Sequence, residues 1–212
     1  MIITKVKEIF TSKSNNIQLY KAGNSGFKVT STALIIGVFH GDEPAGEYLV
    51  NSLINDIRKN PDLLASSVVL LVPCLNPDGK AQNTRENANG VDLNRDFPTK
   101  NQPNIDKEPE LETKFVMEIM NEYKPDRILT IHAPYEVVNY DGPADNMAEN
   151  ISRLNGYPVQ VDIGYPTPGS FGTYAGKERN IPIITLELPE SGTLDQLWYD
   201  NRKAFQYFIS LK

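Results

Sequence analysis

The sequence predicts an α/β fold, a three-layer α/β/α sandwich around a mixed, mostly parallel central sheet. Two observations lead to this prediction. Short apolar runs rich in β-branched residues recur along the chain, and such nearly continuous runs are typical of strands buried on both faces. Stretches with helical spacing lie between them, and this alternation favours strands connected by helices. Because 212 residues suffice for one sizeable core, we expect a single domain over residues 1–212.

The first elements are expected to be an edge hairpin, a core strand and a helix. The short segments IQLYKAG (17–23) and GFKVTS (26–31) resemble the two strands of a hairpin at one edge of the sheet. The run TALIIGVF (32–39) predicts the first core strand. A helix is expected over residues 44–59, where apolar residues at four-residue spacing share one face and basic residues near the end suit the helix dipole.

Three further apolar runs resemble the first core strand, and three further stretches have helical spacing. The predicted strands are 67–75, 127–133 and 181–189, and the predicted helices are 109–123, 146–155 and 194–211. Residues 76–108 have almost no apolar periodicity. An irregular stretch of that length inside a compact domain is usually functional or disordered.

Composition and charge argue against several classes of protein. A net charge of −6 disfavours a nucleic-acid-binding protein, which usually carries a basic face. No stretch approaches the ~20 apolar residues of a membrane helix, and the charged N-terminal residues do not resemble a signal peptide. The single cysteine, Cys74, cannot form an internal disulfide, which suits a reducing compartment. We therefore expect a cytoplasmic protein that binds neither nucleic acid nor membranes.

Four polar residues fall near the ends of predicted core strands, where open α/β sheets bind ligands. His40 and Glu43 follow the first core strand, His132 ends the third, and Glu187 lies near the end of the fourth. Two imidazoles and one carboxylate form a ligand set of catalytic Zn²⁺. Taken alone, His40 and Glu43 fit a strand-end histidine and a carboxylate favoured by a helix dipole. The similar position of His132 favours a metal site.

The segment from residue 76 to residue 98 makes this interpretation more specific, because it concentrates Asn, Asp, Arg and Gly. Together with other short motifs, it resembles the zinc carboxypeptidase superfamily. The matching pieces are, in order, H-x-x-E (40–43), N-P-D-G (76–79), T-R (84–85), G-V-D-L-N-R (90–95), T-I-H (130–132), G-S (169–170) and T-L-E-L (185–188). The resemblance implies the sandwich fold of that family, one Zn²⁺ per chain and hydrolysis of an amide bond next to a free carboxylate.

The resemblance also implies roles for individual residues. His40, Glu43 and His132 would be the zinc ligands, and Glu187 the general base that passes a proton from water to the leaving amine. The sequence around Glu187 is apolar, so we expect burial to raise its pKa toward the range that a base needs near neutral pH. The alternative for Glu187 is an exposed carboxylate on an edge strand. Arg85 matches the arginine that stabilises the oxyanion.

Four further residues match positions around the substrate. Asn94 and Arg95 match the pair that binds the terminal carboxylate of the substrate, a task that suits the planar guanidinium. Asp92 matches a carboxylate that orients a zinc-bound histidine, with a loop-capping hydrogen bond as its alternative role. Tyr165 matches the mobile tyrosine of the specificity loop, and Tyr174 is a competing candidate.

Within the superfamily, HGDEPAG, TRENANGVDLNRDFP and GYPTPGSFGTYAG most closely resemble the bacterial murein peptide amidase A group. That group hydrolyses the γ-D-glutamyl–diaminopimelate bond, so the resemblance implies a small muropeptide-like substrate and a role in cell-wall recycling. One alternative is an N-acyl amino-acid deacylase of the aspartoacylase or succinylglutamate desuccinylase type, which shares H-x-x-E and D-L-N-R. Another is a non-catalytic homologue that binds muropeptides, although the chain keeps all four groups of the predicted site.

Overall fold

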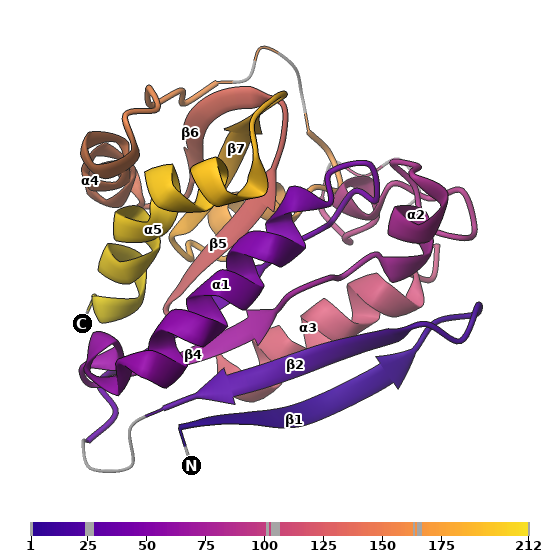
Figure 1. The fold of residues 1–212 in the computed structure, drawn as a ribbon. Helices are drawn as coiled ribbons and strands as arrows, with labels where there is room; N and C mark the ends of the chain where they lie inside the picture. The colour runs from indigo at the N-terminus through magenta and orange to yellow at the C-terminus, as the bar shows by residue number, and fades with distance from the viewer. Residues whose placement is uncertain are drawn as a thin grey trace.

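A computed structural model describes residues 2–23, 28–100, 102, 107–162, 164 and 167–211. In these residues a seven-stranded sheet, in the order β1-β2-β4-β3-β5-β7-β6, forms the middle of three layers (Figure 1). The strands are β1 (Ile3–Phe10), β2 (Asn16–Ala22), β3 (Ser31–Ile36), β4 (Ser67–Val72), β5 (Arg127–His132), β6 (Tyr135–Asp141) and β7 (Ile183–Pro189). The predicted three-layer sandwich is therefore confirmed.

The centre of the sheet is parallel and its two sides are antiparallel. Strands β4, β3, β5 and β7 run in the same direction, whereas β1, β2 and β6 pair antiparallel with their neighbours. Every residue of β4 and of β5 is buried, as expected for strands covered on both faces. Because the four parallel strands share one direction, their carboxyl ends meet at one edge of the sheet, and the polar residues that follow them are brought together there.

Helices cover both faces of the sheet. One hydrophobic core joins α1, α4 and α5 to one face, and a second core joins α3 and the segment around η3 to the other. The helices are α1 (Ala45–Lys59), η1 (Pro61–Leu64), α2 (Pro77–Gln82), η2 (Leu93–Arg95), α3 (Leu111–Tyr123), α4 (Asp145–Asn155), η3 (Gly172–Lys177) and α5 (Leu194–Ser210). Among the described residues, no helix combines the length and apolar character needed to cross a bilayer.

The predicted hairpin between residues 17–23 and 26–31 is wrong. Strand β2 instead lies between β1 and β4 and pairs antiparallel with both. Within residues 26–31, residues 28–30 belong to no strand, and Ser31 begins the parallel strand β3. Strand β1 was missed because it is an edge strand with a register shift between Lys5 and Lys7, so its apolar residues do not alternate regularly.

Two elements near the site, β6 and α2, were also absent from the sequence prediction. Strand β6 is an edge strand with four of its seven residues exposed or half-buried, which leaves a weak apolar pattern. Helix α2 has only six residues and lies within the stretch 76–108 that was expected to be irregular. It begins after Asn76, whose side-chain oxygen accepts a hydrogen bond from the Gly79 amide at 2.9 Å, a capping contact that stabilises a short helix.

Candidate metal centre and active site

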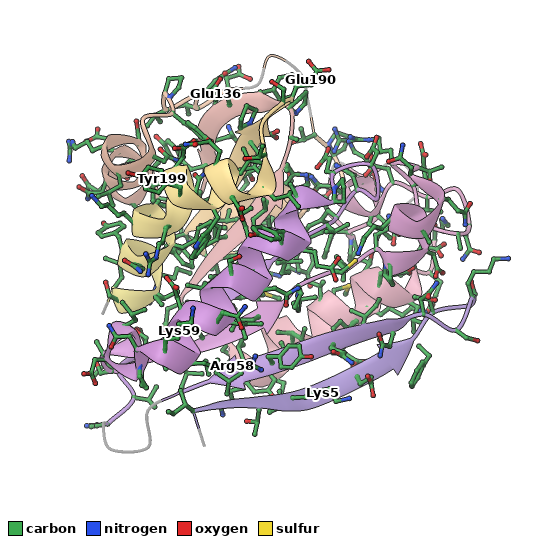
Figure 2. All side chains as sticks on the ribbon, viewed as in Figure 1. Lys5, Arg58, Lys59, Glu136, Glu190 and Tyr199 are labelled. Atoms are coloured by element: carbon green, nitrogen blue, oxygen red, sulfur yellow. The ribbon has the colours of Figure 1, made fainter. Side chains whose placement is uncertain are left out.

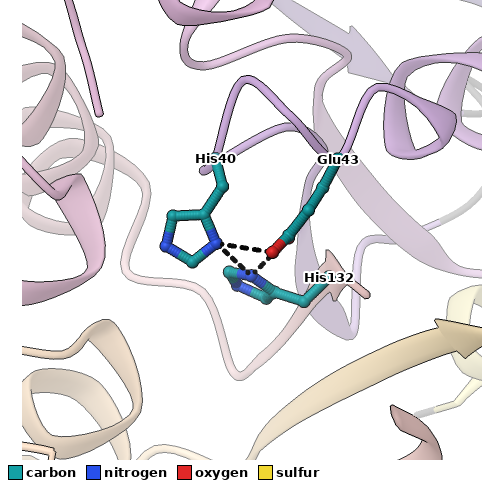
Figure 3. A group of neighbouring side chains, drawn as sticks. All are labelled: His40, Glu43 and His132. Carbon is teal, nitrogen blue, oxygen red and sulfur yellow. Dashed lines mark hydrogen bonds and ion pairs between the residues drawn. The ribbon is translucent and has the colours of Figure 1, made fainter. Parts of the chain in front are cut away.

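The two histidines of the chain meet Glu43 at the carboxyl edge of the parallel strands (Figure 3). His40 and Glu43 lie in the connection from β3 to α1, and His132 is the last residue of β5. The Nδ1 atom of His40 lies 2.9 Å from Glu43 Oε1. The Nδ1 atom of His132 lies 3.0 Å from Glu43 Oε2 and 3.2 Å from His40 Nδ1. Segments 92 residues apart thus direct three potential ligand atoms to one point.

The loop that carries His40 is held by close packing against α2. A Cβ atom at Gly41 would lie only 2.0 Å from the carbonyl carbon of Gly79, so only glycine fits there. The Gly41 amide also donates to the Arg85 carbonyl. The glycine therefore lets the His40 loop and the loop after α2 approach closely enough to share one site.

The three ligand atoms fit a zinc ion. In a tetrahedral site with metal–ligand bonds of about 2.0–2.2 Å, ligand atoms lie about 3.3 Å apart, and the three distances here are 2.9, 3.0 and 3.2 Å. Both histidine side chains are buried, and Glu43 is nearly so. Two imidazoles and one carboxylate that line a cavity form the donor set of catalytic zinc.

Asp92 contacts His40 on the side of the ring that faces away from the other two ligands. Its Oδ1 atom lies 3.0 Å from His40 Nε2, the ring nitrogen that faces away from the ligand cluster. Its Oδ2 accepts a hydrogen bond from Arg85 Nε at 3.0 Å. A carboxylate on the far nitrogen of a metal-binding histidine fixes the tautomer and raises ligand basicity. Asp92 also accepts a hydrogen bond from the Asn94 amide at 2.8 Å, so the contacts that both predicted roles require are present together.

These contacts alter the protonation of the ligand set before metal binds. Burial lowers the pKa of His40, but hydrogen bonds to Asp92 and Glu43 outweigh it and raise that pKa to about 8. Burial raises the pKa of Glu43, but its hydrogen bonds to His132 and His40 bring it down to about 2. Without metal, the His40 imidazole therefore carries an additional proton at neutral pH. That proton occupies the ring nitrogen that would otherwise bind the metal.

The metal affinity should consequently depend on pH below 8. A proton on His40 must leave before its nitrogen can bind Zn²⁺, so we expect the affinity to fall about tenfold per pH unit as the pH drops from 8 to 6. Calorimetric titration of the metal-free protein with zinc across this range measures the slope. In Asp92→Asn, the pH below which the zinc affinity begins to fall should be lower, because the His40 imidazolium loses an anionic partner. A slope of zero in the unaltered protein would contradict the expectation.

Glu187 faces the same site from the neighbouring strand. It lies in β7, where it pairs in register with His132 on one side and Val137 on the other. The residue is 9% exposed, and its Oε2 atom has no hydrogen-bond partner among the described residues. Burial raises the pKa of Glu187, as expected from its apolar sequence surroundings. The alternative of an exposed edge carboxylate is wrong, because β7 is an interior strand.

The predicted carboxylate-binding pair lies beside this centre. Asn94 and Arg95 belong to η2, and both line the cavity next to the metal ligands. The side-chain oxygen of Asn94 accepts a hydrogen bond from the Phe171 amide at 2.9 Å, which ties η2 to the segment before η3. Arg95 donates from one terminal nitrogen to the Asn94 carbonyl at 2.7 Å. This contact orients the guanidinium at the cavity wall.

Of the two candidates for the substrate-contacting tyrosine, the structure describes only Tyr174. Tyr165 lies outside the described residues. Tyr174 lies within η3 and is 4% exposed, with its ring packed against Phe97 and Phe171. Arg179 stacks on the same ring, with its guanidinium carbon 3.3 Å from the ring centre. A ring held on several sides does not suit a mobile contact with substrate, which disfavours Tyr174.

A cavity of about 410 Å³ extends from the metal ligands along β6 and β7. Its walls include residues that the sequence motifs did not indicate, namely Asn139, Asp141, Lys177 and Glu190. In Figure 2, Glu190 and Glu136 mark the side of the molecule on which β6 and β7 lie. Arg58 and Lys59 mark the far side, at the C-terminal end of α1. Asn139 and Asp141 were missed because strand β6 was not predicted. Lys177 and Glu190 were missed because each is an isolated polar residue outside any motif.

Comparison with known proteins gives the family. The sequence profile described as zinc carboxypeptidase matches residues 3–208. The chain belongs to the zinc carboxypeptidase family. It is 34% identical to "Murein peptide amidase A" of Vibrio campbellii over 75% of this chain and 70% of that protein. It is 29% identical to the protein of the same name from Escherichia coli K12, over 74% of this chain and 71% of that one. This zinc carboxypeptidase family member is therefore a zinc-dependent hydrolase that acts on peptides.

Solved structures confirm the fold of this family member. The crystal structure of murein-tripeptide amidase MpaA from Escherichia coli O157 aligns with a TM-score of 0.74 and 21% identity, covering 100% of this chain and 93% of that one. Carboxypeptidase A from Helicoverpa armigera aligns with a TM-score of 0.79 and 16% identity, covering 98% of this chain and 68% of that one. The predicted carboxypeptidase-like sandwich is thus confirmed.

Proposed function

We propose that this zinc-dependent hydrolase cleaves the γ-D-glutamyl–diaminopimelate bond of small peptides derived from peptidoglycan. The observation that carries the proposal is one continuous cavity that is lined by the metal ligands, by Arg95 and by further charged residues of both signs. A substrate with a free carboxylate and further charged groups suits such a cavity. The relatives named murein peptide amidase A support the same assignment.

His40, Glu43 and His132 would hold the zinc ion. When bound, Zn²⁺ supplies a Lewis acid that polarises the scissile carbonyl and lowers the pKa of a water molecule. Asp92 keeps His40 in the tautomer whose Nδ1 lone pair is free to bind metal, because Asp92 accepts the proton on Nε2. Asp92 and His40 thus prepare the ligand set without taking part in proton transfer.

Glu187 would act as the general base. Its unpartnered Oε2 can take a proton from the attacking water and return it to the amide nitrogen of the leaving residue. Its raised pKa brings its basicity closer to neutral pH, as this transfer requires. Arg85, whose Nε is held by Asp92, would donate to the carbonyl oxygen as that oxygen gains negative charge.

Asn94 and Arg95 would bind the free carboxylate of the leaving residue, and Tyr165 would contact the substrate from the specificity loop. Binding of that carboxylate would place the scissile bond between the metal ligands and Glu187. We further propose that residues 1–212 act as one catalytic domain and that the enzyme recycles cell-wall peptides in the cytoplasm. The family profile, which matches residues 3–208, supports a single catalytic unit.

A defined set of substrates tests the proposal. The zinc-loaded protein should release diaminopimelate from L-Ala-γ-D-Glu-meso-diaminopimelate, detected by mass spectrometry, and leave N-succinylglutamate and N-acetylaspartate intact. Turnover of only the two acyl amino acids would establish the deacylase alternative instead. Protein that binds the tripeptide but neither holds zinc nor cleaves any substrate would establish the non-catalytic alternative. An α-linked tripeptide with the same composition is the matched control for the γ-linkage.

A further inference from the structure

An ion pair lies in the wall of the cavity, away from the catalytic residues. Asp141 ends β6, Lys177 ends η3, and Lys177 Nζ lies 3.2 Å from Asp141 Oδ1. The Asp141 side chain is 14% exposed and that of Lys177 59% exposed. Both residues line the cavity that holds the metal ligands. None of the sequence motifs includes either residue, and neither has a role in the proposed chemistry.

The pairing of β6 with β7 places Asp141 at a defined distance from the general base. Val137 of β6 pairs with Glu187, Asn139 with Thr185, and Asp141 with Ile183. Alternate residues of a strand share one face, so Asn139 and Asp141 lie on the Glu187 side of the sheet. Asp141 lies four positions after Val137 along the strand, which corresponds to about 13 Å. The strand pair therefore forms one wall, with Glu187 near one end and Asp141 near the other.

Two glycines make room for the Asp141 carboxylate. A Cβ atom at Gly172 would lie 2.2 Å from Asp141 Oδ2, and one at Gly176 would lie 2.5 Å from the Asp141 Cβ. Any larger residue at either position would displace this side chain. Burial raises the pKa of Asp141, and Lys177 lowers it in part, so the carboxylate gains from a further cationic partner. The carboxylate is thus held in a defined place while still facing the cavity.

We propose that Asp141 and Lys177 determine specificity by binding the far end of the leaving residue, a zwitterionic group with an ammonium and a carboxylate on one carbon. This inference rests on the proposed function and names the feature of the substrate that the cavity recognises. The substrate ammonium lies against Asp141 and the substrate carboxylate against Lys177, so that the two charge pairs are antiparallel. Diaminopimelate has such a group at the end of three methylenes.

Charge complementarity favours the zwitterion over a single cation. A leaving lysine would bring its ammonium to Asp141, but it would also meet the ammonium of Lys177 without an anion between them. A leaving residue with only a carboxylate would leave Asp141 facing that anion. A residue that carries both charges satisfies both protein groups and leaves no charge unpaired.

Three peptides separate these contributions in the unaltered enzyme. L-Ala-γ-D-Glu is linked to meso-diaminopimelate, to L-lysine, which lacks the far carboxylate, or to L-2-aminopimelate, which lacks the far amine. We expect the KM for the diaminopimelate peptide to be about 10- to 100-fold lower than for either of the others. The lysine peptide brings a second ammonium near Lys177 without an anion between them, and the aminopimelate peptide brings a second carboxylate near Asp141 without a cation. Equal KM values for the three peptides, or a preference for lysine, would overturn the inference.

Variants assign the effect to the two residues. Asp141→Asn should raise the KM for the diaminopimelate peptide about 10- to 100-fold. It should lower the KM for the aminopimelate peptide, because the carboxylate that faces its anion is removed. Lys177→Gln should raise the KM about three- to tenfold for the diaminopimelate peptide, a smaller effect because Lys177 is more exposed. It should lower the KM for the lysine peptide, because the repulsion between the two ammonium groups is removed. In both variants kcat and zinc content should stay unchanged. Variant effects that are the same for all three peptides would overturn the inference.

The remote ion pair between Lys7 and Glu118, at 2.6 Å, provides matched controls, Lys7→Gln and Glu118→Gln, which should change none of these values. Lys177→Gln removes an exposed side chain and tests the inference even if Asp141→Asn does not fold. An unaltered enzyme that never cleaves the diaminopimelate peptide would refute the proposed function and this inference together. Cleavage with equal KM values would refute this inference alone.

Discussion

Replacing Glu187 with glutamine is expected to lower kcat by about 10²- to 10⁴-fold while leaving one zinc ion per chain. Glutamine has almost the same shape as glutamate, but its amide cannot take a proton from water. Glu187 is not among the three residues whose atoms converge on the metal position, so the ligand set stays complete. Steady-state hydrolysis of the diaminopimelate tripeptide, together with metal analysis of the same sample, measures both quantities.

Glu112→Gln is the matched control for this change. Glu112 of α3 is also a buried glutamate, and burial raises the pKa of its carboxyl as well, but it hydrogen-bonds Asn87 rather than lining the cavity. Its replacement should leave kcat unchanged. A Glu187→Gln variant with normal kcat would show that another group takes the proton. A variant that loses its zinc would show that Glu187 supports the ligand set instead.

The metal centre was predictable from the sequence because its residues occupy positions fixed by secondary structure. His40, Glu43 and His132 follow or end strongly apolar strands, and the carboxyl ends of parallel strands meet at one edge. The spacing of the family motifs added the remaining assignments, including Asp92. Its contact with His40 arises through the loop after α2, which the apolar pattern alone does not describe. For Asp92, the family motif therefore predicted a role that apolar periodicity alone could not predict.

The edges of the sheet and the cavity wall that contains Asp141 and Lys177 were not predictable in this way. Strands β1 and β6 are partly exposed, so their sequences lack the continuous apolar runs that marked the interior strands. The position of Asp141 depends on the register of β6 against β7, a pairing between residues more than 40 positions apart. Lys177 reaches Asp141 from η3, and neither residue has a local signal that indicates the other.

Removing the imidazole of His132 is expected to weaken zinc binding by more than about 100-fold. Loss of a residue that merely orients a ligand already costs about 10- to 100-fold in metal affinity, and loss of a ligand itself should cost more. In His132→Ala, His40 and Glu43 would remain as two ligands, and they face each other at 2.9 Å without the third atom that completes the set. Equilibrium dialysis against a zinc chelator of known affinity measures the change, and hydrolysis should fall in proportion to the metal lost.

The same substitution also removes a buried ring, which stacks on Phe39 with 5.5 Å between ring centres, so lost packing must be separated from lost ligation. Thr130→Ala makes that separation, because Thr130 is buried on the same strand two residues earlier and is absent from the ligand set. Thr130→Ala should keep its zinc, and His132→Ala should lose it while keeping its far-UV circular dichroism spectrum. If His132→Ala held zinc as firmly as Thr130→Ala, the metal would have to lie elsewhere, and Glu187 would have no activated water to deprotonate.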